Sequence, residues 1–449
     1  MSNTIDPPEE IKTPKGPPKD IDTRTARREE GPARKTFEAD ICVLGAGVSG
    51  VSAALEAARA GNEVVLVDAA SSIGGQAVNS IIGTIIGLYD HGENPRQLTH
   101  GIADDMVADL LAEGAMVERT GGYFKTAIYQ YDEVRLARWM ESAIAEAGIE
   151  TLLGTVLTDV AFEDGRVQHL DCINRFGPVR IDADGFVDAS GDGSLTWEAG
   201  LEMREPTAPV YGTLSFTMEG YDTEAVSELA VEEVHERLAE VGDEYGLVRE
   251  DGQLIHHPNS EFLLANITHM ETPVDPSGYA EMVFEGRRQV DNVVEFLRAE
   301  FPDIFADVRV RSYGDPGIRQ TRWIKSRDQL TLDELRSGER PDDAVARAAW
   351  WVELHDSEEK FHLEQFDWGH VYYIPLSCMI PAQADNIVAA GRCVDADTHA
   401  LSAIRVMGPC IAMGAAAAHA LDLAGTDPVH QVDIDALQQR LRANLEFEG

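Results

Sequence analysis

Short apolar runs alternate with small-residue and amphipathic stretches along most of this chain, and the alternation predicts strands and helices in turn. Residues 40–44 (Asp-Ile-Cys-Val-Leu) are almost entirely apolar, which is typical of a parallel strand buried on both faces. A glycine-rich turn follows, then an Ala-rich helix over 51–60 that Gly61 stops, and a second β-branched strand over 63–67. These elements predict a βαβ unit.

The same reasoning predicts a series of further helices and strands. We expect helices at 131–147, 223–241, 278–301 and 406–423, and strands at 151–160, 167–174, 179–187 and 387–390. Strands that alternate with helices in this way indicate an α/β protein.

The chain is too long for one compact core, so we expect more than one structural domain. The predicted parts are an N-terminal arm over 1–37, a dinucleotide-binding domain over 38–204 and 369–425, an inserted substrate domain over 205–368, and a tail helix over 426–449. The arm is rich in proline and poor in large apolar residues, so we expect it to be disordered or extended. An arm of this kind is also able to wrap a neighbouring subunit, which favours a homo-oligomer.

The turn after the first strand has the spacing of a dinucleotide-binding loop, G-x-G-x-x-G. It reads Gly45-Ala46-Gly47-Val48-Ser49-Gly50. In such a loop the first glycine permits the tight turn, the second lets the backbone approach a pyrophosphate, and the third lets the helix pack on the strand. The helix N-terminus favours the anion. Asp68 ends the second strand, where a carboxylate accepts hydrogen bonds from a ribose hydroxyl.

Other motifs accompany this loop and resemble those of a known family. They are Gly74-Gly75-Gln76 after the second strand, Asp188-Ala189-Ser190-Gly191-Asp192-Gly193 after a later strand, Gly391-Arg392-Cys393, Arg405-Val406-Met407-Gly408-Pro409, and Gly317-Ile318-Arg319-Gln320-Thr321-Arg322. Over roughly residues 38–425 the chain resembles the FAD-dependent oxidoreductases of the glutathione-reductase-like superfamily. Gln320 replaces the Glu of the family's G-x-R-E-T-R element, and Glu353 replaces the Asp of a D-x-H element that ends at His355.

The resemblance implies an α/β fold with a discontinuous Rossmann-like FAD-binding domain and an inserted α+β substrate domain. It implies FAD as the cofactor and no metal. The residues expected at the cofactor are Gly45, Ala46, Gly47, Ser49, Gly50, Asp68, Gly74, Gly75, Gln76, Val156, Ser190, Gly191, Asp192, Gly391, Arg392, Val406 and Met407. Val156 is included because the strand around it is expected to pass under the adenine.

Flavin chemistry also needs a group that moves a proton and a group that holds the substrate. We expect His399 and Arg405 at the reactive edge of the flavin, with His355 and either Arg319 or Arg322 across the pocket. The predicted reaction is hydride transfer between a small organic substrate and flavin N5, with an unknown electron acceptor. The alternatives are an NAD(P)-dependent dehydrogenase and a flavoprotein electron-transfer subunit.

The net charge of −42 changes the range of partners that we expect. Such a surface repels nucleic acid and anionic membranes. It is explained equally well by an ordinary soluble surface and by adaptation to high salt, where charge repulsion is screened.

The chain shows neither a signal peptide nor an apolar run near the ~20 residues of a membrane span, so a cytoplasmic location is the expectation. The five cysteines include no C-x-x-C pair, which argues against zinc and iron–sulfur sites.

Overall fold

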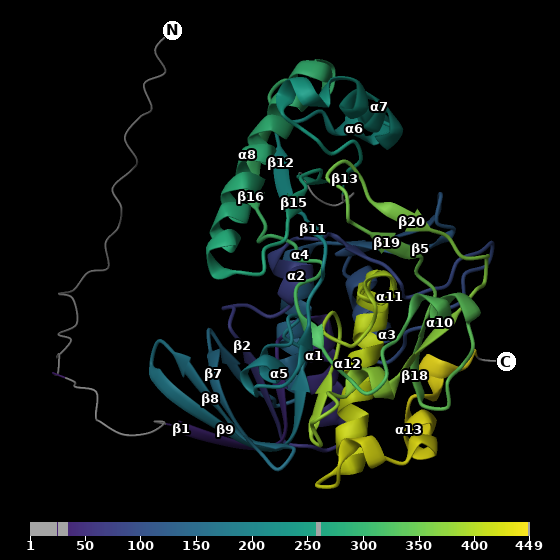
Figure 1. The fold of residues 1–449 in the computed structure, drawn as a ribbon. Helices are drawn as coiled ribbons and strands as arrows, with labels where there is room; N and C mark the ends of the chain where they lie inside the picture. Colours follow the sequence, from purple (N-terminus) through teal and green to yellow (C-terminus); the bar gives the residue numbers. More distant parts are fainter. Residues whose placement is uncertain (1–24, 26–34, 257–261, 448–449) are drawn as a thin grey trace. The chain divides into compact units, whose positions relative to one another are not determined.

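A parallel sheet forms the centre of the fold (Figure 1). The computed structural model describes Thr25 and residues 35–256 and 262–447. The chain divides into two units, Met1–Pro32 and Ala33–Gly449, and the fold lies in the second. The parallel strands follow the order β6-β2-β1-β9-β22. They are β1 (Lys35–Leu44), β2 (Val64–Asp68), β6 (Glu150–Leu153), β9 (Gly177–Asp188) and β22 (Ile387–Ala389).

Strand β1 explains why its sequence is apolar without alternation. Ile41 and Val43 pack into one hydrophobic cluster, whereas Cys42 and Leu44 pack into another. Successive side chains of a strand point to opposite faces, so a strand covered on both sides must be apolar throughout. The predicted α/β class with a parallel sheet is therefore confirmed.

The predicted arm over 1–37 lies outside the described residues, apart from Thr25 and its last three residues. Those three residues, Lys35–Phe37, belong to β1 and pair with β9, so the strand begins earlier than predicted. The proposed role of the arm in an oligomer stays a prediction.

Two helices pack closely against each other on one face of the sheet. They are α1 (Val48–Arg59) and α12 (Met407–Ala424). Small residues permit the contact: a Cβ added to Gly414 would lie 2.1 Å from the carbonyl oxygen of Ser49. The Ser52 hydroxyl donates to the carbonyl oxygen of Ile411 (2.7 Å). Helix α12 is long and apolar enough to cross a membrane by length and composition, but 78% of it is buried inside this fold, as in the core helix of a soluble protein.

An antiparallel hairpin continues the sheet next to β9. It consists of β7 (Val156–Glu163) and β8 (Arg166–Asn174), and β8 pairs with β9. Its buried side chains pack with Cys42 and Leu44, on the face opposite α1 and α12. The single strand predicted over 151–160 is therefore two strands. Strand β6 pairs in parallel with β2, whereas β7 pairs in antiparallel with β8. Gly154 and Thr155 form the break between them, and their N–H groups donate to the carbonyl oxygens of Ala70 and Asp68.

The inserted region has an apolar core of its own, built from residues 214–308. Its antiparallel sheet follows the order β13-β14-β12-β16, and its helices lie together in Figure 1. The elements are β12 (Phe216–Glu219), β13 (Gln253–His256), β14 (Leu263–Asn266), β16 (Arg309–Tyr313), α6 (Thr223–Glu228), α7 (Val231–Val241), α8 (Pro276–Glu300) and α9 (Pro302–Phe305). The helix predicted over 223–241 is interrupted because Leu229 and Ala230 adopt extended backbone.

The predicted substrate domain over 205–368 is too long at its C-terminal end. Residues from Trp323 to Val352 contribute buried side chains to the main cluster around α1 and α12 rather than to the inserted core. They form short antiparallel pairs that flank the main sheet. These elements are β17 (Trp323–Ile324) with β10 (Met203–Arg204), β18 (Ala344–Ala348) with β21 (Tyr372–Pro375), β19 (Val352–Leu354) with β20 (His362–Glu364), and α10 (Leu332–Ser337).

The remaining elements complete the walls of the fold. They are α2 (Gly75–Asn79), β3 (Thr84–Ile85), α3 (Ile102–Ala112), β4 (Met116–Gly121), β5 (Thr126–Tyr131), α4 (Glu133–Glu146), α5 (Ser194–Glu198), β11 (Tyr211–Gly212), β15 (Met270–Glu271) and α11 (Thr398–Ile404). The tail predicted as one helix over 426–449 contains two short helices instead, α13 (Ile434–Arg440) and α14 (Arg442–Leu445). Both contribute buried leucines to the main cluster.

Candidate functional site

The glycine motifs meet around a cavity of about 470 Å³, here called the smaller cavity. The end of β1, the N-terminus of α1, the end of β2, α2, the loop after β9 and the start of α12 all contribute to its wall. The predicted cofactor residues that line it are Gly45, Gly47, Ser49, Asp68, Gly74, Gly75, Gln76, Ser190, Gly191, Asp192, Arg392 and Met407.

The wall of the smaller cavity fits a dinucleotide. Gly45 has a φ of 101°, and a Cβ on it would lie 2.3 Å from the carbonyl oxygen of Ala189, so only glycine permits this turn. Gly47 differs, because a Cβ there would meet nothing closer than 4.0 Å and would project into the open cavity. Within the described residues, no side chain caps the N-terminus of α1, which leaves its N–H groups to an anion. Nη1 of Arg392 is buried without a hydrogen-bond partner among the described residues.

Asp68 has a second role that its position at the end of β2 does not predict. Its Oδ2 accepts a hydrogen bond from the N–H of Ala46 (2.5 Å), and its Oδ1 accepts one from the N–H of Ala70 (2.7 Å). The carboxylate therefore holds the loops on both sides of it while it also lines the cavity. Its contact with a ribose stays a prediction.

Some predicted cofactor residues shape the smaller cavity without lining it. Ala46 is fully buried, Gly50 packs against the carbonyl of Gly45, and a Cβ on Gly391 would lie 2.6 Å from Oγ of Ser49. Val156 is different, and its place under the adenine stays a prediction. It begins β7 with its side chain 48% exposed and lines neither cavity, because the chain turns into the hairpin at this residue.

A larger cavity of about 790 Å³ adjoins the smaller one. The two share wall residues, which are Gln76, Ser80, Ile82, Ile318, Arg392, Arg405 and Met407. Val406 and Met407, at the N-terminus of α12, lie at this junction, so the positive end of the helix dipole faces it. The far wall is made by the inserted region and by β19 and β20.

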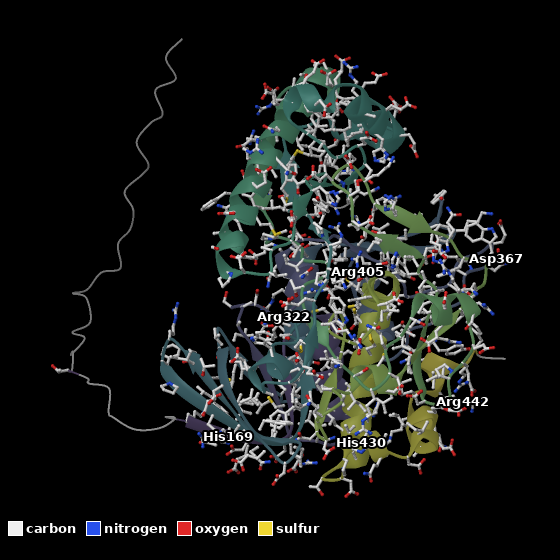
Figure 2. The ribbon with its side chains drawn as sticks, in the orientation of Figure 1. His169, Arg322, Asp367, Arg405, His430 and Arg442 are labelled. Atoms are coloured by element: carbon white, nitrogen blue, oxygen red, sulfur yellow. The ribbon has the colours of Figure 1, made fainter. Side chains whose placement is uncertain are left out.

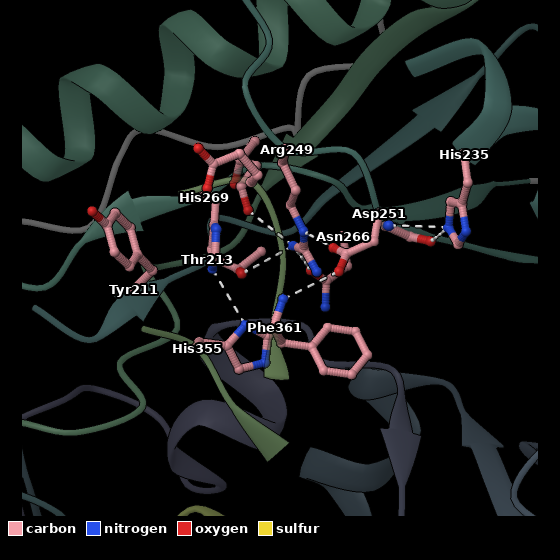
Figure 3. Close-up of polar contacts among 12 residues, drawn as sticks. Tyr211, Thr213, His235, Arg249, Asp251, Asn266, His269, His355 and Phe361 are labelled. Carbon is pink, nitrogen blue, oxygen red and sulfur yellow. Dashed lines mark hydrogen bonds and ion pairs between the residues drawn. The ribbon is translucent and has the colours of Figure 1, made fainter. Parts of the chain in front are cut away.

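A chain of hydrogen-bonded side chains lies in the wall of the larger cavity (Figure 3). Nε2 of His355 lies 3.0 Å from Oε1 of Glu353, and Nδ1 of His355 lies 3.3 Å from Nε2 of His269. Nδ1 of His269 contacts the carbonyl oxygen of Glu358 (2.9 Å). The Trp350 indole donates to Oε2 of Glu353 (3.2 Å). Both histidines are buried. His355 and Glu353 line the larger cavity, whereas His269 does not.

The carbonyl group at the end of this hydrogen-bonded series determines which nitrogen of each histidine carries a proton. The Glu358 carbonyl only accepts, so Nδ1 of His269 carries a proton and a neutral His269 accepts at Nε2. Nδ1 of His355 therefore donates to it, which leaves Nε2 of His355 unprotonated where it faces Oε1 of Glu353. That contact needs one proton, which Glu353 and His355 share. We call these two residues the proton pair.

The surroundings weaken the hold of His355 on this proton. Burial lowers the pKa of His355 well below its ordinary value, and the nearby guanidinium groups of Arg319, Arg405 and Arg249 lower it further. Burial and Arg249 likewise lower the pKa of His269 to about 4. A proton at His355 is therefore readily given up to an acceptor in the cavity.

Arg319 and Arg405 enter the larger cavity without acidic partners. Nη1 of Arg319 donates to the carbonyl oxygen of Tyr211 (2.8 Å), and Nη2 of Arg405 donates to that of Glu353 (3.0 Å). Neither guanidinium forms an ion pair with a carboxylate in the described part of the chain. Burial and the nearby guanidinium groups of Arg405 and Arg249 lower the pKa of Arg319, and burial lowers that of Arg405.

The structure does not bring His399 to this site, so the prediction that it faces the flavin is wrong. His399 lies in the first turn of α11 with an exposed side chain and lines neither cavity. The residues that follow, Ala400–Ile404, are buried, so the helix turns His399 outward. Arg322 also lies outside both cavities, 4.2 Å above the ring of Trp197, and Figure 2 shows it apart from Arg405.

Sequence reasoning missed Arg249 and His269, which come from the inserted region and belong to no motif. Both are buried, and Arg249 pairs with Asp251 while it donates to Asn266 (3.1 Å) (Figure 3). A histidine in the apolar run from Leu263 to Met270 was the only available signal, because apolar runs rarely bury such a residue without a partner.

One family model and several solved structures are similar to this chain. A family model described as FAD dependent oxidoreductase matches residues 40–441. Similar solved structures include a geranylgeranyl bacteriochlorophyll reductase-like protein from Thermoplasma acidophilum, which is 12% identical over 92% of this chain and 93% of that chain, with a TM-score of 0.46. They also include the myxobacterial chondrochloren halogenase CndH, 13% identical over 91% of this chain and 79% of that chain, with a TM-score of 0.48. Because the family model spans most of its length, this chain belongs to the FAD-dependent oxidoreductase family.

Proposed function

We propose that this enzyme transfers a hydride between flavin N5 and a small organic molecule bound in the larger cavity, while the proton pair moves the accompanying proton. The observation that carries the proposal is the junction of the two cavities. The smaller cavity has the backbone groups that a dinucleotide needs, and the larger one has a proton donor and acceptor in its wall.

FAD is the cofactor of this family, and the smaller cavity suits it. The N-terminus of α1 at Gly47–Ser49 would hold the pyrophosphate, and Gly74–Gln76 would hold the chain that leads to the ring. When bound, FAD supplies a two-electron acceptor or donor. The NAD(P)-only alternative is set aside by the family membership.

The proton pair accepts or donates the proton that accompanies a hydride transfer. A substrate that loses hydride from carbon also loses a proton from the neighbouring oxygen or nitrogen, and the reverse reaction returns both. Glu353 reaches the cavity and shares a proton with His355, whose other nitrogen is occupied by His269. The geometry therefore directs the proton to the cavity side.

Two other roles fit this site less well. An electron-transfer subunit has no need of a cavity of about 790 Å³ with a titratable wall. Thiol redox chemistry is disfavoured at Cys410, the cysteine that lines the smaller cavity, because burial raises its thiol pKa to about 11.

The test is an anaerobic screen of small alcohols, hydroxy acids and amines against the FAD-loaded protein, followed by the loss of visible flavin absorption. A compound that reduces the flavin is then deuterated at the reacting carbon. We expect a primary isotope effect on flavin reduction. Flavin reduction without any isotope effect in single-turnover experiments, at a rate proportional to substrate, would contradict direct hydride transfer.

A further inference from the structure

The larger cavity has the opposite charge balance from the molecule as a whole. The chain carries 79 acidic and 37 basic side chains, yet Arg and Lys outnumber Asp and Glu in this wall. The basic residues are Arg119, Arg249, Arg319, Lys360, Arg392 and Arg405, and the acidic ones are Glu250, Asp251 and Glu353. The wall of the larger cavity is therefore positively charged, although the chain as a whole is negative.

No acidic residue of the wall forms an ion pair with Arg319 or Arg405 in the described part of the chain, although the nearby carboxylate of Glu353 favours the charged form of both. Asp251 pairs with Arg249, Glu250 is exposed, and the carboxylate of Glu353 is engaged by His355 and Trp350. Two adjacent guanidinium groups without a counter-ion are unfavourable, because burial of an unpaired charge is costly. Such a pair is stabilised when an anion binds between them.

Arg319 and Arg405 both line the larger cavity, on the substrate side of the site, and Arg405 also lines the smaller one. Arg319 lines only the larger cavity, whereas Arg392 lines both cavities and lies beside Asp192 at the smaller one. Much of the remaining wall is apolar and aromatic. Its members include Ile82, Ile86, Phe124, Ile128, Trp350 and Phe361. The cavity thus combines a cationic end with a surface that suits a hydrocarbon body.

We propose that Arg319 and Arg405 bind the carboxylate of the substrate, which makes the substrate a small organic acid with an apolar body. This inference rests on the proposed function, because it assigns the ligand of the same cavity. The planar guanidinium fork matches the two oxygens of a carboxylate, and charge-assisted hydrogen bonds of this kind are short and strong.

The experiment compares acids with their uncharged amides. FAD-loaded protein is titrated with benzoate, 3-phenylpropionate and hexanoate, with the three matching amides, and with inorganic phosphate. Binding is measured by calorimetry and by the change in the flavin spectrum. We expect at least one acid to bind at least about 10-fold more tightly than its amide and than phosphate.

Three variants locate the site. Arg319→Gln and Arg405→Gln should each weaken binding of the acid by about 10- to 100-fold, with FAD still bound. Arg322→Gln is the matched control, since Arg322 lies in the same segment but outside both cavities, and it should bind as the unchanged protein does.

Several results would overturn the inference. These are equal binding of acid and amide, no binding by any of the three acids, tighter binding of phosphate, or unchanged affinity in Arg319→Gln. Loss of FAD from Arg405→Gln would assign that arginine to the cofactor instead. The proposed function fails separately: acid binding that depends on Arg319, without hydride transfer from any acid, keeps the carboxylate site and refutes the reaction.

Discussion

The two cavities that meet at Arg392 and Arg405 are built in different ways. Backbone from several short glycine-containing segments makes most of the smaller cavity, with a helix N-terminus at its base. Side chains from segments far apart in the sequence make the larger one, among them Arg249, Arg319 and His355. A cofactor that is common to a family requires a constant backbone, whereas a substrate is selected by side chains on a variable wall. The two regions should therefore respond differently to substitution.

The largest effect is expected from Gly47→Val in the smaller cavity. Its φ of −71° permits a side chain, so the protein should fold, but the valine would occupy the open space that a pyrophosphate needs. We expect FAD binding to weaken by ~3 kcal/mol or more, the upper end of overpacking costs. The flavin-to-protein ratio after gel filtration measures this. Ala60→Val, at the exposed end of α1, is the control and should keep its FAD.

The next effect concerns stability and comes from His269, which contacts His355 of the larger cavity's wall. Its pKa is lowered from 6.5 to about 4 in the folded protein, so below pH 6.5 the unfolded chain takes up a proton that the folded one refuses. Stability is therefore lost as the pH falls from 6.5 towards 4, by up to about 3 kcal/mol.

Urea denaturation of the protein and of His269→Gln at pH 7 and pH 4.5 tests this prediction. The free energy of unfolding should fall more steeply with acid in the unchanged protein than in the variant. Equal slopes for the two proteins would show that His269 is not held in its neutral form.

A smaller effect is expected from Asp68→Ala. The variant loses a ribose acceptor and also the contacts to the N–H groups of Ala46 and Ala70. We expect FAD binding to weaken by about 1–3 kcal/mol, and less in Asp68→Asn, which keeps one oxygen acceptor. Fluorescence titration of the apoprotein with FAD measures both. FAD affinity that stays the same in the alanine variant would remove Asp68 from the cofactor site.

The smallest effect is expected from His399→Ala. The side chain is exposed on α11 and lines neither cavity, so flavin reduction should change by less than about twofold. A loss of the size expected for an acid–base group, about 10²-fold or more, would mean that α11 reorients when ligands bind.

The smaller cavity could largely be predicted from the sequence because its requirements are local. A positive φ at Gly45 and a side-chain-free approach at Gly47 demand glycine, and glycine at this spacing is readable. The single strand expected over 151–160 is two strands because the chain leaves the parallel sheet between β6 and β7, where the apolar pattern does not change.

The larger cavity could be predicted only in part because its residues are brought together by the fold. Arg319, His355 and Arg405 were found through their motifs, whereas Arg249 and His269 have no local signature. His399 was wrongly placed because the segment between Gly391 and α12 contains helix α11, and one residue of difference along a helix decides which face a side chain takes. Chain order alone does not determine that direction.

The central claim is that FAD is held by one cavity while the proton is moved by the wall of the other. Single-turnover flavin reduction in Glu353→Gln tests it most directly, with the substrate found in the screen and with Glu364→Gln as control, because Glu364 is a carboxylate on the neighbouring strand that pairs with Arg336. We predict that Glu353→Gln retains its full FAD content and reduces the flavin about 10²–10⁴-fold more slowly, while the control keeps its rate. An unchanged rate of flavin reduction in Glu353→Gln would contradict the account.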